Sequence, residues 1–341
     1  MTLKSSLERA AVETIYNGDA GGDVARAVQN PDSFHFVQNT RSIVGNATVL
    51  PDLAWQEFDR IVLEEKRDRL VAANDLIDRG LVKRTRGLGA TVLKWQDASD
   101  MGPAEASMDA VSRGQRDRQT FSTNFLPLTI FFKDVSFSKR DIEASKDPVF
   151  GIPLDTSALQ EATKLVFELI ETVTFTGLSG YAAGGGSIRG YEDFSFRNTG
   201  SLTANWDSSA ANGTTIRNDV ANMIQAKTDA KFHGMDSVLY IPSAYQKVLG
   251  EDYKANSDKT IKTRLLELDG LSDIKVADKM TANNVILSQM TADNMRMVIG
   301  LDIQTIHWST DGMTENFKVM AIVVPNPRAT QGGRSGIVHY T

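Results

Sequence analysis

Hydrophobic and polar residues alternate in two stretches of the chain that flank a polar segment marked by glycine and proline. The first stretch is Gly89–Trp95, the second is Gln119–Lys133, and the turn between them includes Ser99–Glu105. A period of two is typical of β-strands, so the pattern predicts a long β-hairpin. An isolated two-stranded ribbon is only marginally stable in water. We therefore expect the hairpin to pack against a neighbouring molecule.

A single long amphipathic helix is predicted after the hairpin, over residues 156–176. Ser157–Gln160 fits a capping box, and Gly177 is placed to end the helix. At about 1.5 Å per residue, the helix would be about 32 Å long. Taken alone, it is most simply a core helix of an α/β domain. Its apolar residues recur three and four positions apart: Leu159, Ala162, Val166, Leu169 and Val173.

Two carboxylates lie one turn apart on this predicted helix. Glu168 and Glu171 flank the apolar stripe, so we expect both to be solvated at its edge. A glycosidase-like pair of carboxylates is the alternative, but most Asp and Glu side chains of a protein are simply exposed.

The first fifty residues have little periodic pattern and are interpreted as an arm that packs against something else. Leu3–Tyr16 fits a short amphipathic helix, which the glycine-rich Asn17–Gly22 would end. After Pro51, a surface helix with one buried stripe is predicted from the helical spacing of four apolar residues: Trp55, Phe58, Ile61 and Val62.

Beyond the long helix, residues 177–212 are rich in Gly, Ser, Asn and Thr and are interpreted as loops with short strands. Helices and strands then alternate, which predicts a compact α/β unit with mixed strands. Helices are predicted at Thr215–Lys231, after Pro242 and at Lys259–Leu268. Strands are predicted at Ser237–Ile241, Ile274–Ala277, Val285–Gln289, Met295–Ile299, Ile303–Trp308 and Phe317–Val324.

Composition limits the classes of protein that fit. A chain of 341 residues is expected to form two subdomains. The hydrophobic share is 41%, but no apolar run approaches the roughly 20 residues of a membrane helix, and the first residues lack the apolar core of a secretory signal. A net charge of −6 argues against a protein whose main task is to neutralise phosphates. With no cysteine, disulfides and thiolate metal sites are excluded, and a reducing cytoplasm fits.

Catalytic motifs are incomplete throughout the sequence. The glycine cluster Gly184–Gly190 matches neither a dinucleotide-binding nor a phosphate-binding loop, and is better explained as a flexible loop. Ser179, Ser187 and Ser335 lack the second glycine of a hydrolase nucleophile elbow. The four histidines are scattered, without an i, i+4 pair for zinc. We therefore predict no catalytic, cofactor-binding or metal-binding residues, with a soluble α/β hydrolytic enzyme as the remote alternative.

The order of these elements resembles that of the major capsid proteins of tailed bacteriophages, which share the Hong Kong 97 fold with encapsulin shell proteins. The resemblance covers nearly the whole chain and rests on architecture rather than on a catalytic signature. Four phrases in particular are similar to the encapsulin-related branch: Leu50–Asp59, Val135–Ser145, Ser257–Glu267 and Phe317–Val324.

The resemblance implies an α+β, Hong Kong 97-type fold with named parts. The arm would be residues 1–50, and the extended hairpin, called the E-loop in this family, residues 84–133. The axial α/β domain would be 214–303. The peripheral domain would combine 51–83, 134–213 and 304–341, including the spine helix 156–176.

The resemblance also implies a function without an enzyme activity or cofactor. The chain would assemble with itself, through hexamers and pentamers, into an icosahedral virion capsid that encloses DNA and is built in the host cytoplasm. Scaffold, portal and decoration proteins would be separate partners, DNA contact would be weak and indirect, and no membrane is involved. An encapsulin-type compartment is the alternative. Some members crosslink their subunits through Lys and Asn, but Lys94 has no identifiable partner, so we predict no crosslink.

Charges are segregated along the E-loop. Residues 97–109 carry acidic side chains and no basic one, whereas arginines flank them on both sides. We expect the acidic tip of one subunit to meet the arginines of another, which would fix register more than it adds affinity. A solvated charged hairpin is the alternative, because exposed ion pairs are typically worth under about 1 kcal/mol. The predicted contact residues are Arg84, Arg86, Asp97, Asp100, Glu105, Asp109, Arg113, Arg116 and Arg118.

Overall fold

The computed structural model describes residues 71–102, 104, 106, 108, 117–145, 157–254, 259–309 and 311–341. All of them belong to one compact unit, Ser42–Thr341. The predicted N-terminal arm and the helix predicted after Pro51 lie outside the described residues. The fold mixes helices and sheets, as the α+β prediction requires.

The first sheet has four strands in the order β1-β11-β12-β4. Its centre is a long antiparallel pair, β11 (Met295–Ser309) and β12 (Thr314–Pro327). On one side β1 (Val82–Arg84) runs parallel to β11, and on the other β4 (Phe131–Ser138) runs antiparallel to β12. The short helix α5 (Lys139–Ser145) follows β4 directly.

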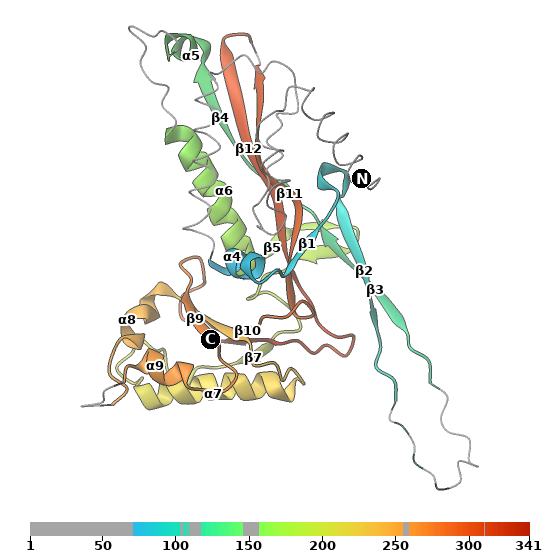
Figure 1. Cartoon of the computed structure of the whole chain (residues 1–341), viewed down its shortest axis with the longest axis vertical. Coiled ribbons are helices and arrows are strands. Elements are labelled where there is room, and N and C mark those ends of the chain that lie inside the picture. The colour runs from blue at the N-terminus through green and yellow to red at the C-terminus, as the bar shows by residue number, and fades with distance from the viewer. Residues whose placement is uncertain are drawn as a thin grey trace, which may run out of the picture. The chain divides into compact units, whose positions relative to one another are not determined.

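The predicted spine helix is confirmed as α6 (Ser157–Thr176), which packs against β4 and β12 (Figure 1). It ends at Gly177, whose φ of 73° suits glycine. A side chain there would also collide with Gly190, since a Cβ would lie 2.8 Å from that backbone nitrogen. Four of the five predicted stripe residues are buried, but Leu169 is 41% exposed, so that part of the prediction is wrong.

The second sheet has five strands in the order β7-β13-β10-β8-β9. Their bounds are Asn198–Gly200 (β7), Ile337–Tyr340 (β13), Val285–Gln289 (β10), Ser237–Ile241 (β8) and Asp273–Val276 (β9). The central strands β8 and β10 are buried along their whole length, which fits the short apolar runs that they contain, Val238–Ile241 and Val285–Leu287.

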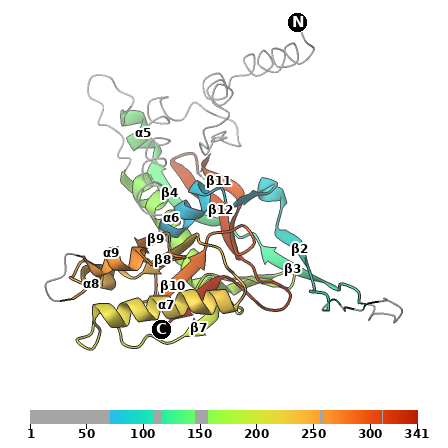
Figure 2. The ribbon, with the colours of Figure 1, turned by 60° about the horizontal axis from the view of Figure 1, so that its bottom comes forward.

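Helices cover this second sheet. Figure 2 shows α7 (Gly213–Asp229) along the strands, with α8 (Gln246–Leu249) and α9 (Ile261–Leu266) beside it. Asn212 begins α7 by accepting a hydrogen bond from the backbone N–H of Thr215 at 2.9 Å. Val220 and Met223 of α7 share one core with Leu239 and Leu287 of the strands. A 3-10 turn, η2 (Ser243–Tyr245), leads into α8.

Strands from segments assigned to different predicted domains pair with one another. The last strand β13 and the short strand β7 pair within the five-stranded sheet, not with the spine helix and the four-stranded sheet. The division into named domains itself stays a prediction. None of the helices in the described part of the chain combines the length and apolarity that a membrane crossing requires.

Candidate functional site

The predicted hairpin is formed by β2 (Val92–Ala98) and β3 (Phe121–Pro127), paired from Val92 with Pro127 to Ala98 with Phe121. In both ribbon views it leads away from the two sheets (Figures 1 and 2). A 3-10 turn, η1 (Gly87–Gly89), precedes β2. The returning stretch Gln119–Lys133 was predicted as one strand, but it belongs to two. The hairpin strand β3 ends at Pro127, and a separate strand, β4 of the four-stranded sheet, begins at Phe131.

A second small hairpin supports the root of the first. It consists of β5 (Leu178–Ala183) and β6 (Gly186–Ile188), and β6 lies against β3. The contact is close, since a Cβ on Gly186 would lie 1.9 Å from the carbonyl oxygen of Phe125. The glycine cluster predicted to be a flexible loop is therefore a tight hairpin turn, with Gly184 and Gly185 at positive φ.

A cavity of about 350 Å³ opens at this root, which we call the root pocket. It is lined by residues of β2, β3 and β6, by residues 194–196 and by residues 326–331. Two of the lining residues form an ion pair, Arg328 Nη2 with Asp97 Oδ1 at 2.9 Å, and Asn124 donates to the same carboxylate at 2.5 Å. The lining also includes Trp95, Thr123, Phe125, Arg189, Ser195 and Phe196.

Two hydrogen-bond donors of the root pocket are buried without a partner. They are Nε1 of Trp95 and Nε of Arg328. A buried polar group without a partner costs about 1–3 kcal/mol and calls for an explanation. Both groups are hydrogen-bond donors, and neither is exposed to solvent in the subunit.

The structure places the nine predicted contact residues in different situations. Asp97 is bound to Arg328 in the root pocket, and Arg84 pairs with Asp302 at 2.9 Å, so both have partners in their own chain. Arg86, Asp100 and Arg118 are exposed. The other four, Glu105, Asp109, Arg113 and Arg116, lie outside the described residues. The contact hypothesis therefore stays a prediction.

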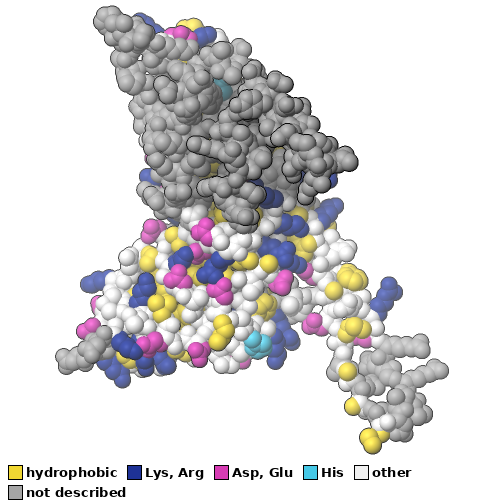
Figure 3. Space-filling view, viewed as in Figure 1, with side chains coloured by type: hydrophobic (Ala, Val, Ile, Leu, Met, Phe, Trp, Pro, Cys, Tyr) yellow, Lys and Arg dark blue, Asp and Glu magenta, His cyan; other side chains and the backbone are white. Residues whose placement is uncertain are grey.

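Some features of the site had no signal in the sequence. Arg328 lies 231 residues from Asp97, and no local pattern links the two. Apolar side chains also stand exposed along the hairpin, as the yellow atoms in Figure 3 show. Met101 is 57% exposed, Met108 fully exposed and Phe121 66% exposed. Such side chains are expected where a surface is covered by a partner.

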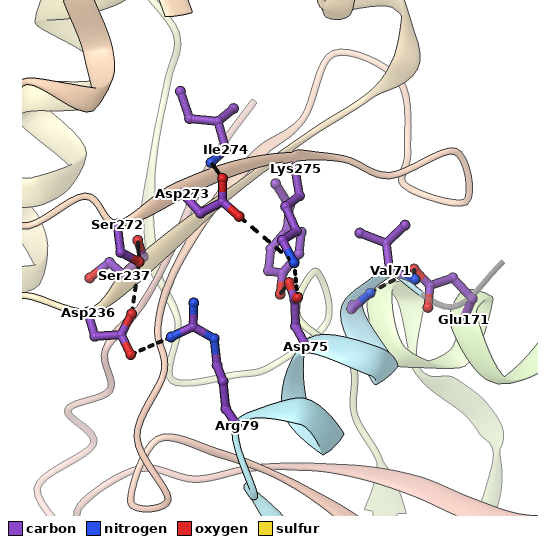
Figure 4. A network of polar contacts seen from close by, with 12 residues as sticks. Val71, Asp75, Arg79, Glu171, Asp236, Ser237, Ser272, Asp273, Ile274 and Lys275 are labelled. Atoms are coloured by element: carbon purple, nitrogen blue, oxygen red, sulfur yellow. Dashed lines mark hydrogen bonds and ion pairs between the residues drawn. The ribbon is translucent and has the colours of Figure 1, made fainter. Parts of the chain in front are cut away.

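A buried polar network joins the spine helix to the second sheet through α4 (Val71–Asp78), as Figure 4 shows. Glu171 of α6 is 2% exposed, and its Oε1 accepts hydrogen bonds from the backbone N–H groups of Val71 and Ala72. From the same short helix, Asp75 binds the side chains of Tyr240 and Lys275 in the five-stranded sheet. The expectation that Glu171 is solvated is therefore wrong, because α4 covers it.

The titration of Glu171 reflects this burial. Desolvation raises its pKa to about 7, and the hydrogen bonds from the α4 backbone only partly offset that rise. The nearby charge of Asp75 raises the pKa further. Glu168, one turn earlier, pairs with Lys279 at 2.8 Å instead of forming a carboxylate pair with Glu171. Within the described ranges, no group of three or more His, Asp or Glu side chains could hold a metal ion.

The sequence matches the model of one protein family over most of its length. The family described as "Family of unknown function (DUF6260)" matches residues 44–340. The chain belongs to this family. No curated protein matches this DUF6260 chain.

Solved structures identify the fold of this DUF6260 chain. A virus-like particle from Pyrococcus furiosus matches with a TM-score of 0.61 at 18% identity, over 84% of this chain and 99% of the other. The capsid of Myoviridae Phage XM1 matches with a TM-score of 0.58 at 12% identity, over 77% and 90%. The capsid of a native GTA particle gives 0.57 at 14% identity, over 80% and 91%. The fold is thus the predicted Hong Kong 97-type capsid fold.

Proposed function

We propose that this chain is a major capsid protein that assembles with itself, through hexamers and pentamers, into an icosahedral virion shell enclosing DNA. The observation that carries the proposal is the β2–β3 hairpin, which leaves the sheets of its own subunit with apolar side chains exposed, on a fold matched by three shell proteins. No catalysis is part of the proposal.

Burial gives the physical reason for the hairpin to contact a neighbour. Along β2 and β3, only Leu126 and Pro127 at the root are buried within the subunit. A two-stranded ribbon of this kind gains stability when a further surface covers one face. In a ring of identical subunits, each hairpin would cover the next subunit, and the same contact would repeat until the ring closes.

Charge would set the register of this contact. Asp97 and Arg84 already have partners in their own chain, so the proposal depends on the remaining predicted residues. The acidic side chains are Asp100, Glu105 and Asp109, and the basic ones are Arg86, Arg113, Arg116 and Arg118. Opposite charges across an interface steer association and suppress wrong pairings more than they add affinity.

The proposed partners follow from a shell that closes around DNA. Scaffold, portal and decoration proteins would be separate chains, and assembly would take place in the host cytoplasm. The net charge of −6 fits weak, indirect contact with the packaged DNA, since a protein that grips phosphates needs clustered Lys and Arg. One observation favours a second candidate, an encapsulin-type compartment: the structure that matches with a TM-score of 0.61 is a virus-like particle.

The proposal is tested by measuring the mass of the purified full-length chain with size-exclusion chromatography and light scattering, beside negative-stain electron microscopy. We expect closed shells or rings. A single charge-reversed variant, Arg113, Arg116 and Arg118 all to Glu, should fold normally yet fail to form them. Normal shells from this variant would refute the charge contact. A chain that stays a monomer or dimer, even with the scaffold of the same virus added, would refute the shell function.

A further inference from the structure

The root pocket and the tip of the hairpin are complementary in chemistry. The pocket has two arginines, Arg189 and Arg328, against one aspartate, Asp97. The tip beyond the pocket, residues 98–109, has three acidic residues and no basic one.

We propose that the root pocket receives the hairpin tip of a second copy of this chain, with Met101 or Met108 inserted between its aromatic side chains. This inference rests on the proposed function, because a tip reaches the pocket of another copy only within an assembly. It names the place on the neighbouring subunit where the tip docks.

The apolar part of the tip suits the pocket walls. The rings of Phe194 and Phe196 pack edge to face with their centroids 5.8 Å apart, and Phe196 is 52% exposed at the pocket. Methionine is unbranched and flexible, so it fills irregular cavities, and its sulfur makes favourable contacts with aromatic rings. Met108 has no cover at all in its own subunit.

The polar part of the pocket requires acceptors, which an inserted tip would bring. Nε1 of Trp95 and Nε of Arg328 are buried donors without a partner. Every residue of an inserted segment offers a backbone carbonyl, and Asp100 adds an exposed carboxylate at the tip. Both donors are closed to solvent in the isolated subunit, so insertion would pair them only by shifting the side chains of Trp95 and Arg328.

Both arginines of the pocket already form an ion pair in their own subunit. Arg328 holds Asp97 through Nη2, and its buried Nε has no partner in the subunit. Arg189 pairs with Asp193 at 2.6 Å, but both side chains are about 40% exposed, and an exposed pair of this kind is easily reorganised.

The absence of cysteine from the chain makes the contact directly testable. Two single variants, Met108→Cys at the tip and Ser195→Cys at the pocket, are purified separately, mixed before assembly, and oxidised after the shells form. Ser195 is exposed at the pocket. The matched control replaces Ser195→Cys with Asn222→Cys, which is exposed on α7. Thr123→Cys is a second pocket variant, in case the first does not assemble.

Mixed shells of the tip and pocket variants should give at least about tenfold more covalent dimer on a non-reducing gel than the control, because thiols held together have a high effective concentration. The double variant in one chain should give a ladder of multimers. Shells that form normally but give no dimer above the control, with either pocket variant, overturn the docking while leaving the proposed function intact. A crosslink formed only within single chains also overturns it. Failure of the unmodified chain to assemble refutes the proposed function instead.

Discussion

The stability of the subunit should depend on pH through Glu171 in a direction opposite to that of an ordinary paired carboxylate. Burial raises its pKa from 4.5 to about 7. For a raised pKa, the stabilising contribution is fully present below about pH 4.5 and is lost as the pH rises through about 7. Above that pH, the folded chain holds a buried negative charge whose Oε2 has no hydrogen-bond partner.

The size of the effect follows from the difference between the two pKa values. At about 1.36 kcal/mol per pKa unit, the rise from 4.5 to about 7 corresponds to about 3 kcal/mol in all. About 2.5 kcal/mol of this falls between about pH 5 and about pH 8.5. The variant Glu171→Gln keeps an oxygen that can accept from the N–H groups of Val71 and Ala72 but never becomes charged.

The assay is urea denaturation of the unassembled chain, followed by tryptophan fluorescence, for the wild type and Glu171→Gln at several pH values. The unfolding free energy of the variant minus that of the wild type should rise by about 2.5 kcal/mol from about pH 5 to about pH 8.5. Other groups titrate in both proteins and cancel in the difference. Glu161→Gln, whose side chain is 61% exposed on the same helix, should show no such rise. A constant difference for Glu171→Gln would refute the buried, raised-pKa carboxyl.

Two further substitutions test the packing that holds the hairpin and the network. Asp75→Asn should lower the unfolding free energy by about 2 kcal/mol, because it leaves Lys275 without its buried partner; this value allows for the 33% exposure of the lysine side chain. The control is Asp273→Asn, since the Asp273 carboxylate lies 3.9 Å from the same lysine but is 44% exposed, and it should cost less than about 1 kcal/mol. Equal losses in the two variants would contradict the network. Gly186→Ala should cost about 2–3 kcal/mol in the same denaturation assay, because its Cβ would lie 1.9 Å from a backbone oxygen of β3. The control is Gly180→Ala on the same small hairpin, whose Cβ would have no atom within 4 Å, so its stability should stay within about 1 kcal/mol of wild type. Similar stability of the two variants would show that β3 and β6 are not in contact.

Local patterns explain why much of the fold could be predicted. The predicted bounds of β8 and β10 match the structure, because each strand contains a short apolar run, Val238–Ile241 and Val285–Leu287, which is typical of a strand buried on both faces. α6 was predicted within one residue because its capping sequence and Gly177 are local signals. The four residues of β13 are too few to show a period, so this strand was not predicted.

Long-range contacts explain what the sequence could not reveal. The predicted strands Met295–Ile299 and Ile303–Trp308 are one strand, β11, because register shifts around Leu301 absorb the polar break between them. Glu171 occupies a position flanking the helix stripe that is typical of a solvated residue, yet α4 packs over it. Asp97 lies in the acidic segment that was predicted to contact a neighbouring subunit, but it forms an ion pair with Arg328 of its own chain.

A cryo-electron microscopy reconstruction of the purified, assembled chain is the most direct test of the shell function and of the hairpin contact. We expect a closed icosahedral shell in which every β2–β3 hairpin leaves its own subunit and ends at the root pocket of the next one. A shell in which the hairpins fold back onto their own subunits would contradict the proposed contact. A preparation that contains only separate subunits, with scaffold present, would contradict the shell function itself.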